Sequence, residues 1–369
     1  MTRSLQGAVL SDLQATRFAG WRAWPARLAL AGLAALVVYG LVLAARPGTL
    51  VVQNVPPEQS DLVLYRAIAA RVAAGENYYA AATAEQRAEG YPLRPFVTVR
   101  PPTLATVQAT LGPIGSRLLL CGLAGLTWVA FRRRVGATLA AGGIVTGASA
   151  LSVAGLLPLL NAALPYWHDA WAGALILLSI ALRSRERWTL AVLAGLLAVA
   201  MRELALPYLG AMAVIALAEG NRREAGAWAA AILASAVMIA AHAGMVGAYV
   251  TDLDRASPGW GAAGGWTFIL SMVLNSTVMV LAPAWAVALV VPLCLLGWAA
   301  WPGPLGARGA LVLGGYACAF LVIGRADNTY WGMMLGPLLL PGLAFVPGAL
   351  RDLVAAARPA PDQKPALAA

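Results

Sequence analysis

Charged residues are scarce in this chain. Asp, Glu, Lys and Arg make up 11% of its 369 residues, whereas 60% of the residues are hydrophobic. Soluble domains carry about 25% charged residues, so the composition lies far outside the soluble class. Apolar runs of helical length recur from Ala26 to Leu350, and a soluble core of this size would not need them. The chain is therefore expected to be an all-α integral membrane protein.

Motifs of nucleotide, hydrolase and metal chemistry are also missing. The sequence has no Walker loop, no HExxH and no GxSxG. Its three cysteines, Cys121, Cys294 and Cys318, lie inside apolar runs and are too scattered for a metal motif. We interpret them as small buried hydrophobes. The missing motifs argue against cytoplasmic nucleotide chemistry and favour a substrate that is delivered within the membrane.

The net charge of +10 reflects an uneven distribution of basic residues. A topology with both termini in the cytoplasm places sixteen of the 26 basic residues on the cytoplasmic side, but only six of the 16 acidic ones. The other side carries ten of each sign and has no net charge. Because Lys and Arg in short loops set membrane orientation, the excess indicates positive-inside topology. Nucleic acid is not an expected partner.

The apolar runs predict about ten transmembrane helices within residues 27–350. A cytoplasmic segment, 1–26, precedes them, and a Pro/Ala-rich cytoplasmic tail, 351–369, is expected to be disordered. The first run, about 28–45, is longer than a signal-peptide core and lacks a small-x-small cleavage site, so we expect a retained anchor. One large extramembrane piece, the outer loop 46–102, follows this anchor.

Ordered structure is expected inside the outer loop because of its length. An amphipathic helix is predicted at about 60–72, where Leu64, Ile68 and Val72 share one face. We expect this helix to lie on the membrane surface through that apolar face.

Two unusually short helices are predicted in the middle of the chain, at about 188–201 and 204–219. Both ends of this apolar stretch are expected in the cytoplasm, so it must cross the membrane an even number of times. Each helix falls short of the ~20 residues that span a bilayer. The turn at Arg202 and Glu203 should therefore lie below the outer surface, where charge needs a wet cavity lined by protein.

Polar residues gather on the outer face of this topology, and no comparable cluster is expected on the cytoplasmic face. The outer set consists of Asp61, Arg66, Arg100, His168, Asp169, Arg202, Glu203, Arg325, Asp327 and Asn328.

Structural explanations remain open for each of these residues. Asp61 could cap or begin a helix, and Arg202 with Glu203 could form an ion pair of purely structural value. His168 and Asp169 could simply begin a helix beneath an aromatic belt. Arg325 could reach the interface by snorkelling, and Asn328 could cap a turn.

The order of features resembles the GT-C superfamily of membrane glycosyltransferases, which use polyprenyl-phosphate-linked sugars. The outer loop is similar to the family pattern D-x-x-x-Y-x-x-x-A-x-x-x-x-x-G, and Phe96 and Arg100-Pro101-Pro102 match its aromatic/proline element before the second helix. The residues that match the pattern are Asp61, Tyr65, Ala69 and Gly75, followed by Asn77-Tyr78-Tyr79. The closest likeness is to the mannosyltransferase-like and aminoarabinose-transferase-like branches.

One departure concerns the acidic motif. Many relatives have Asp-Glu there, whereas this chain has Asp61-Leu62. The resemblance therefore leaves open which residue is a second functional carboxylate, Asp169 or Glu203.

The resemblance implies transfer of a sugar from a polyprenyl-phosphate donor to a lipid or glycan acceptor at the outer face. Such transfer needs a carboxylate to activate the acceptor hydroxyl, and Asp61 is the expected general base. It also needs cations that stabilise the departing phosphate, for which we expect Arg202 and Arg325, with Arg100 ranked below them. Glu203 is expected to orient Arg202.

The remaining candidate residues are expected to contact the sugar or the acceptor. They are His168, Asp169, Asn328 and Tyr65. No complete metal-ligand set is visible, so no cofactor is predicted, and participation of a divalent cation stays open.

Two alternatives from other classes accompany this interpretation. A transporter or flippase of lipid-linked sugars would place charges along a two-sided path near the midplane. A non-catalytic envelope-assembly protein would not depend on Asp61 at all. The Ala/Gly/Arg-rich composition suggests a bacterial inner (cytoplasmic) membrane. Sugar, acceptor and oligomeric state are not determined by the sequence.

Overall fold

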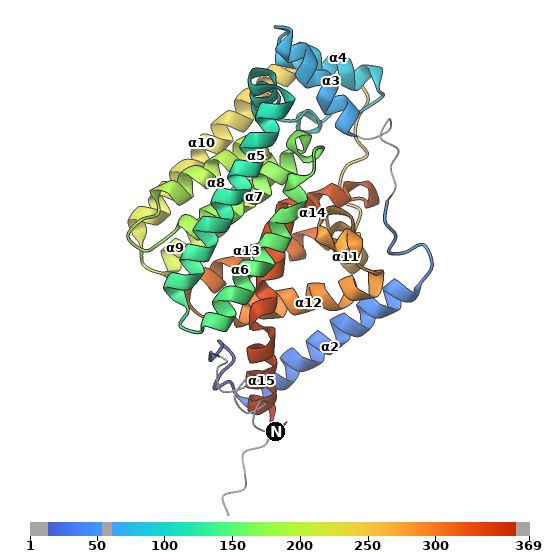
Figure 1. The fold of residues 1–369 in the computed structure, drawn as a ribbon. Coiled ribbons are helices and arrows are strands. Elements are labelled where there is room, and N and C mark those ends of the chain that lie inside the picture. Colours follow the sequence, from blue (N-terminus) through green and yellow to red (C-terminus); the bar gives the residue numbers. More distant parts are fainter. Residues whose placement is uncertain (1–13, 54–60, 359–369) are drawn as a thin grey trace, which may run out of the picture.

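The computed structural model describes residues 14–53 and 61–358, and these residues form a bundle of helices (Figure 1). The described residues contain no β-strand beyond one isolated bridge between Arg94 and Ala256. Half of the proposed N-terminal segment (1–13) and most of the tail (359–369) fall outside the described residues.

Among the described residues, five stretches are long and apolar enough to cross a membrane. They are Ala23–Ala45, Phe96–Thr138, Gly142–Leu160, Arg222–Gly247 and Ala326–Ala357. Shorter apolar helices of 10–17 residues accompany them. The chain is thus a helical membrane protein by length and composition, while the count of about ten spans stays a prediction.

The first half of the bundle contains the outer-loop helices and the longest helix. Its elements are α2 (Ala23–Ala45), α3 (Asp61–Ala73), α4 (Tyr78–Ala88), η2 (Phe96–Thr98), α5 (Thr103–Thr138), α6 (Gly142–Leu156), η3 (Leu157–Leu160), η4 (Leu164–Tyr166) and α7 (His168–Leu182).

The second half alternates short and long helices. Its elements are α8 (Thr189–Met201), η5 (Glu203–Ala205), α9 (Leu206–Ala218), α10 (Arg222–Gly247), α11 (Gly265–Ser276), η6 (Val278–Leu281), α12 (Ala284–Ala300), α13 (Gly303–Phe320), η7 (Ala326–Trp331), α14 (Gly332–Leu339), η8 (Leu340–Phe345) and α15 (Val346–Ala357).

Helix α7 lies at the centre of the core. Its residues from His168 to Ala181 are all buried, because the helix is apolar on every side apart from its first two residues and Ser179. It packs against α5, α8 and α14. Gly173 permits the approach of α14, since a Cβ there would lie 2.5 Å from the carbonyl oxygen of Met333. The start of α7 is thereby held inside the protein.

Helices α3 and α4 lie at one end of the molecule, and α15 lies at the opposite end (Figure 1). Helix α3 begins at Asp61, as the periodicity predicts, but its apolar stripe does not face lipid. Leu64 and Ile68 are buried in a small core of their own, together with Leu93 and Val99. The expectation of a helix lying on the membrane by this face was wrong, because the loop's own residues cover it.

The short helix pair occurs as predicted, with α8 and α9 containing 13 residues each. At about 1.5 Å per residue each helix is about 20 Å long, below the ~30 Å of a hydrocarbon core. The turn between them carries Arg202 and Glu203.

An ion cluster lies at the other ends of α7 and α9. Arg183 contacts Glu219 and Glu224, and Arg308 contacts the same two carboxylates. Arg183 and Arg308 are 2% and 1% exposed. The expectation of no comparable polar cluster at that end was wrong, since residues far apart in sequence meet there.

Two helices continue beyond the apolar runs that predict them. Helix α5 continues past the arginines at 132–134 to Thr138. Helix α15 continues to Ala357, and Asp352 within it accepts hydrogen bonds from the amide and hydroxyl of Thr16. The boundary expected at 350 therefore lies inside a helix, and the first residues of the expected tail are ordered by contact with the N-terminal segment.

Candidate functional site

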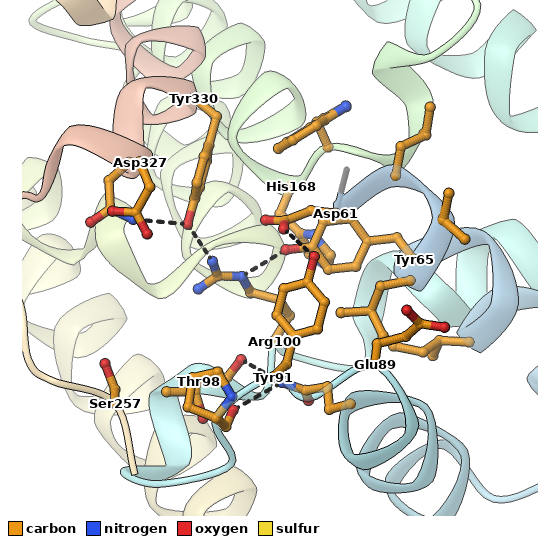
Figure 2. A pocket seen from close by; sticks show the side chains of 18 of the residues that line it. Asp61, Tyr65, Glu89, Tyr91, Thr98, Arg100, His168, Ser257, Asp327 and Tyr330 are labelled. Atoms are coloured by element: carbon orange, nitrogen blue, oxygen red, sulfur yellow. Dashed lines mark hydrogen bonds between the residues drawn. The ribbon is translucent and has the colours of Figure 1, made fainter. Parts of the chain in front are cut away.

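A cavity of about 1070 Å³ lies beneath α3 and α4. Its walls come from α3, the segment after α4, the beginning of α7, the loop after α10 and η7 (Figure 2). This volume is at the upper end of what small-molecule sites occupy. Six of the nine candidate site residues line it: Asp61, Tyr65, Arg100, His168, Arg325 and Asn328.

Arg100 occupies the middle of this cavity (Figure 2). Its Nη2 donates to the Tyr330 hydroxyl at 2.9 Å, and its Nε donates to the Tyr65 hydroxyl at 3.2 Å. The Tyr78 hydroxyl donates to the backbone carbonyl of Arg100 at 2.6 Å. The nearest carboxylate contact is Glu203, 3.7 Å from Nη1. Arg100 thus presents a positive charge whose closest partners are neutral hydroxyls.

Asp61 lines another part of the same cavity. The Tyr91 hydroxyl donates to Asp61 Oδ1 at 2.8 Å (Figure 2). Burial raises the pKa of Tyr91, and the neighbouring Asp61 carboxylate raises it further. The phenol therefore remains a donor at neutral pH and orients the carboxylate.

The charged turn between α8 and α9 lies behind the cavity wall. Arg202 contacts Asp169 at 3.1 Å and also bonds Glu203. The side chains of Arg202 and Asp169 are each 3% exposed, and none of these three residues lines the large cavity. Arg202 does not face the wet cavity that we expected. Its charge is neutralised by two carboxylates.

His168 lines the cavity and directly precedes Asp169 in α7. It is 5% exposed, and its ring is 5.0 Å from the ring of Tyr65 in an edge-on arrangement. Its Nδ1 is buried and has no hydrogen-bond partner within residues 14–53 and 61–358. A buried nitrogen of this kind is costly to leave unsatisfied.

The η7 end of the cavity is built around Arg325. Arg325 contacts Asp327 at 2.7 Å and also donates to the Ser257 hydroxyl and the Gly259 carbonyl. Asn328 Oδ1 accepts from the Arg325 amide at 3.1 Å, so Asn328 caps this turn, as one of the structural explanations proposed.

Loop 251–258 is tied to the outer-loop helices. Arg87 contacts Asp254 at 2.6 Å, and the amide of Leu93 donates to the carbonyl of Arg255. The hydrogen bond from Arg87 holds the pKa of Asp254 below its usual range. These contacts hold loop 251–258, part of which lines the cavity, against the outer-loop helices at neutral pH.

Sequence reasoning missed the tyrosines that complete the site. Tyr330 follows Arg325 in one loop, so its proximity to known candidates was a usable signal. Tyr91 lies 30 positions from Asp61, and no local pattern connects the two. Only the packing of the segment after α4 against α3 brings them together.

No group of three or more His, Cys, Asp or Glu side chains in the described part of the chain is arranged to hold a metal ion. Comparison of the chain with protein-family models, with curated proteins and with solved structures finds no match. The proposal below therefore depends on the cavity's own chemistry and on the sequence resemblance.

Proposed function

We propose that the chain is a membrane glycosyltransferase of GT-C type that uses a polyprenyl-phosphate-linked sugar as its donor. The observation that supports this most is the pairing of Asp61 and Arg100 in one cavity of about 1070 Å³. One supplies a carboxylate for a hydroxyl acceptor, and the other supplies a cation for a phosphate.

Arg100 takes the main phosphate-binding role in this proposal. The phosphate displaces or joins the two tyrosine hydroxyls on the guanidinium, which already has the forked geometry that matches phosphate oxygens. Arg325 lines the same cavity and serves as a second cation, although Asp327 offsets part of its charge. Arg202 is a positioning residue, since two carboxylates already neutralise it.

Transfer is proposed to proceed by direct displacement. The acceptor hydroxyl oxygen forms a bond to the anomeric carbon, and the bond from that carbon to the phosphate oxygen breaks. The hydroxyl proton passes to Asp61, and the lipid phosphate leaves with its electron pair beside Arg100. Cations placed where charge develops are a major source of rate enhancement.

The proposed location is the outer face of a bacterial inner membrane, with both termini in the cytoplasm. Partners would be the donor lipid and a lipid or glycan acceptor. The ion cluster of Arg183, Glu219, Glu224 and Arg308 does not line the cavity, which supports a one-sided site over a carrier path.

The test is a transfer assay with the purified full-length chain in lipid. Radiolabelled polyprenyl-phosphate sugars are offered together with a membrane-glycan extract. We expect label to reach an acceptor with wild type and with Asp252→Asn, a control whose side chain is fully exposed outside the cavity. Donor that binds or crosses the bilayer without any transfer, for every sugar offered, would overturn the proposal in favour of a carrier.

A further inference from the structure

A second cavity lies on the far side of the segment between η2 and α5. It has a volume of about 200 Å³. Arg100 lines the large cavity, whereas its neighbours Val99 and Pro101 line the small one. Successive side chains of an extended segment point to opposite sides, so this segment separates the two cavities.

Hydrogen bonds hold the separating segment from both sides. The Tyr78 hydroxyl donates to the carbonyl of Arg100 at 2.6 Å, and His242 Nε2 donates to the carbonyl of Val99 at 2.9 Å. His242 belongs to α10 and also lines the small cavity. The wall is therefore a fixed part of the structure, and the small cavity is a compartment of its own.

The lining of the small cavity is mostly apolar. Phe96 and Pro102 cover one side, and Met238, Ile239 and Ala241 of α10 cover the other. Helix α10 is one of the five long apolar stretches, with only 22% of its apolar window buried inside the protein. Most of the apolar window is thus not covered by the protein, so the cavity lies beside a helix suited to contact with lipid.

One charged group breaks this apolar lining. Glu203 lines the small cavity, and its Oε2 is buried without a hydrogen-bond partner among the described residues. Its other oxygen, Oε1, contacts Arg202 and lies 3.7 Å from Arg100. Leaving a buried charged acceptor unsatisfied is expensive. A small rotation of the carboxylate toward the cavity would let a donor held there satisfy Oε2.

The surrounding charges decide what kind of donor fits. Arg100 and Arg202 are balanced by Asp169 and Glu203 in one connected cluster. An ammonium group would add an uncompensated positive charge close to two guanidinium groups. A neutral hydroxyl satisfies Glu203 Oε2 and leaves the balance intact.

We propose that the small cavity binds an apolar alcohol from the membrane. Its hydroxyl donates to Glu203 Oε2, and its hydrocarbon chain lies against Met238, Ile239 and Ala241. A volume of about 200 Å³ is below that of sites for whole drug-sized ligands, so the cavity holds the hydroxyl end and the first part of the chain. This site stands whether or not the large cavity carries out sugar transfer.

The experiment uses the purified full-length chain in lipid nanodiscs and two photoreactive probes. One probe is a long-chain alcohol with a diazirine near the hydroxyl, and the other is its methyl ether, which keeps the oxygen but lacks the donor. We expect the alcohol to label peptides containing 96–103 and 238–242 about tenfold more than the ether does, the effect of one hydrogen bond to a charged group.

Two tryptophan substitutions on α10 provide the matched comparison. Ala241 is exposed and lines the cavity, whereas Ala240 is exposed and does not line it. Ala241→Trp should fill the cavity and abolish labelling by the alcohol, while Ala240→Trp should leave it unchanged. The proposal is overturned if alcohol and ether label equally, if neither labels these peptides, or if Ala241→Trp labels as wild type does.

Discussion

Arg100, Arg202 and Arg325 lie near one another in the protein but differ in what neutralises them. Arg202 contacts two carboxylates, and Arg325 contacts one. Arg100 contacts two tyrosine hydroxyls at hydrogen-bond distance and a carboxylate only at 3.7 Å. Because the charge of Arg100 is the least compensated, Arg100 is the residue from which an anionic ligand would gain most.

Exchanging arginine for lysine separates the roles of these residues. Arg100→Lys keeps the charge but loses the forked donors, so we expect donor affinity to fall about tenfold with little change in thermal stability. Arg202→Lys should instead lower thermal stability, because its buried carboxylate partners lose hydrogen bonds. Donor binding and unfolding temperature, measured on both variants, check this. Equal loss of donor affinity in both would contradict the assignment.

Tyr91 gives a second prediction at the residue scale. Tyr91→Phe removes the donor to Asp61, and we expect transfer to fall about tenfold. The raised pKa of Tyr91 means that its hydroxyl stays protonated as pH rises past about 9, since even an unperturbed phenol titrates near 10. Wild-type activity should therefore show no loss from this group between pH 7 and 9. The pH–rate profiles of wild type and variant test both statements.

The sequence predicted some residues of the site and missed others for a physical reason. Asp61, Arg100 and Arg325 stand out because charge is rare in this chain and costly in apolar surroundings. Tyr91 and Tyr330 do not stand out, since tyrosine is common near membrane interfaces without any role in a site. Their contribution depends on which hydroxyl meets which charge, and that is decided by tertiary packing.

At the scale of elements, the point where an apolar run is interrupted was easier to predict than the residue at which a helix ends. The break at Arg202 was visible as charge within an apolar run. The continuation of α5 past the arginines at 132–134 was not, because arginine is a good helix former that tolerates the end of a membrane span. Likewise α15 extends beyond 350 because Asp352 finds a partner in Thr16, a contact that no local pattern reveals.

Helix α5 contains an interruption that only glycine tolerates. Gly112 has φ +67° and ψ 179°, a region that is essentially restricted to glycine. A Cβ there would meet no atom within 4 Å, so the cost of Gly112→Ala is in the backbone alone. We expect a loss of about 1–3 kcal/mol of stability.

A second glycine in the same helix is the control for this prediction. Gly122 lies in regular helix, and a Cβ there also meets no atom within 4 Å. Gly122→Ala should be neutral or stabilise by up to about 1 kcal/mol. Thermal unfolding in detergent compares the two, and equal stability of both variants would show that the kink at Gly112 is not required.

At the scale of the whole molecule, the two ends of the bundle differ in chemistry. At the α3–α4 end, Asp61 and Arg100 line the large cavity and have hydroxyl groups as their closest partners. At the other ends of α7 and α9, Arg183 and Arg308 each contact two carboxylates. This asymmetry favours a site at one face, which the proposed topology places outside the cell.

Cysteine labelling in intact cells tests that topology. In a background with Cys121, Cys294 and Cys318 replaced by alanine, Asp252→Cys should react with a membrane-impermeant maleimide added from outside. Arg223→Cys, which is exposed at the start of α10, should react only after the cells are permeabilised. The reverse pattern would place the large cavity on the cytoplasmic side and contradict the proposed location.

The most direct test of the central claim measures donor binding and sugar transfer with Asp61→Asn under identical conditions. This exchange keeps the size of the side chain and a hydrogen-bond acceptor for Tyr91, while it removes the base. We predict that Asp61→Asn binds the polyprenyl-phosphate sugar as wild type does and loses transfer by about 10²- to 10⁴-fold. Transfer by Asp61→Asn at the wild-type rate would contradict the assignment of Asp61 as the base and, with it, the proposed mechanism.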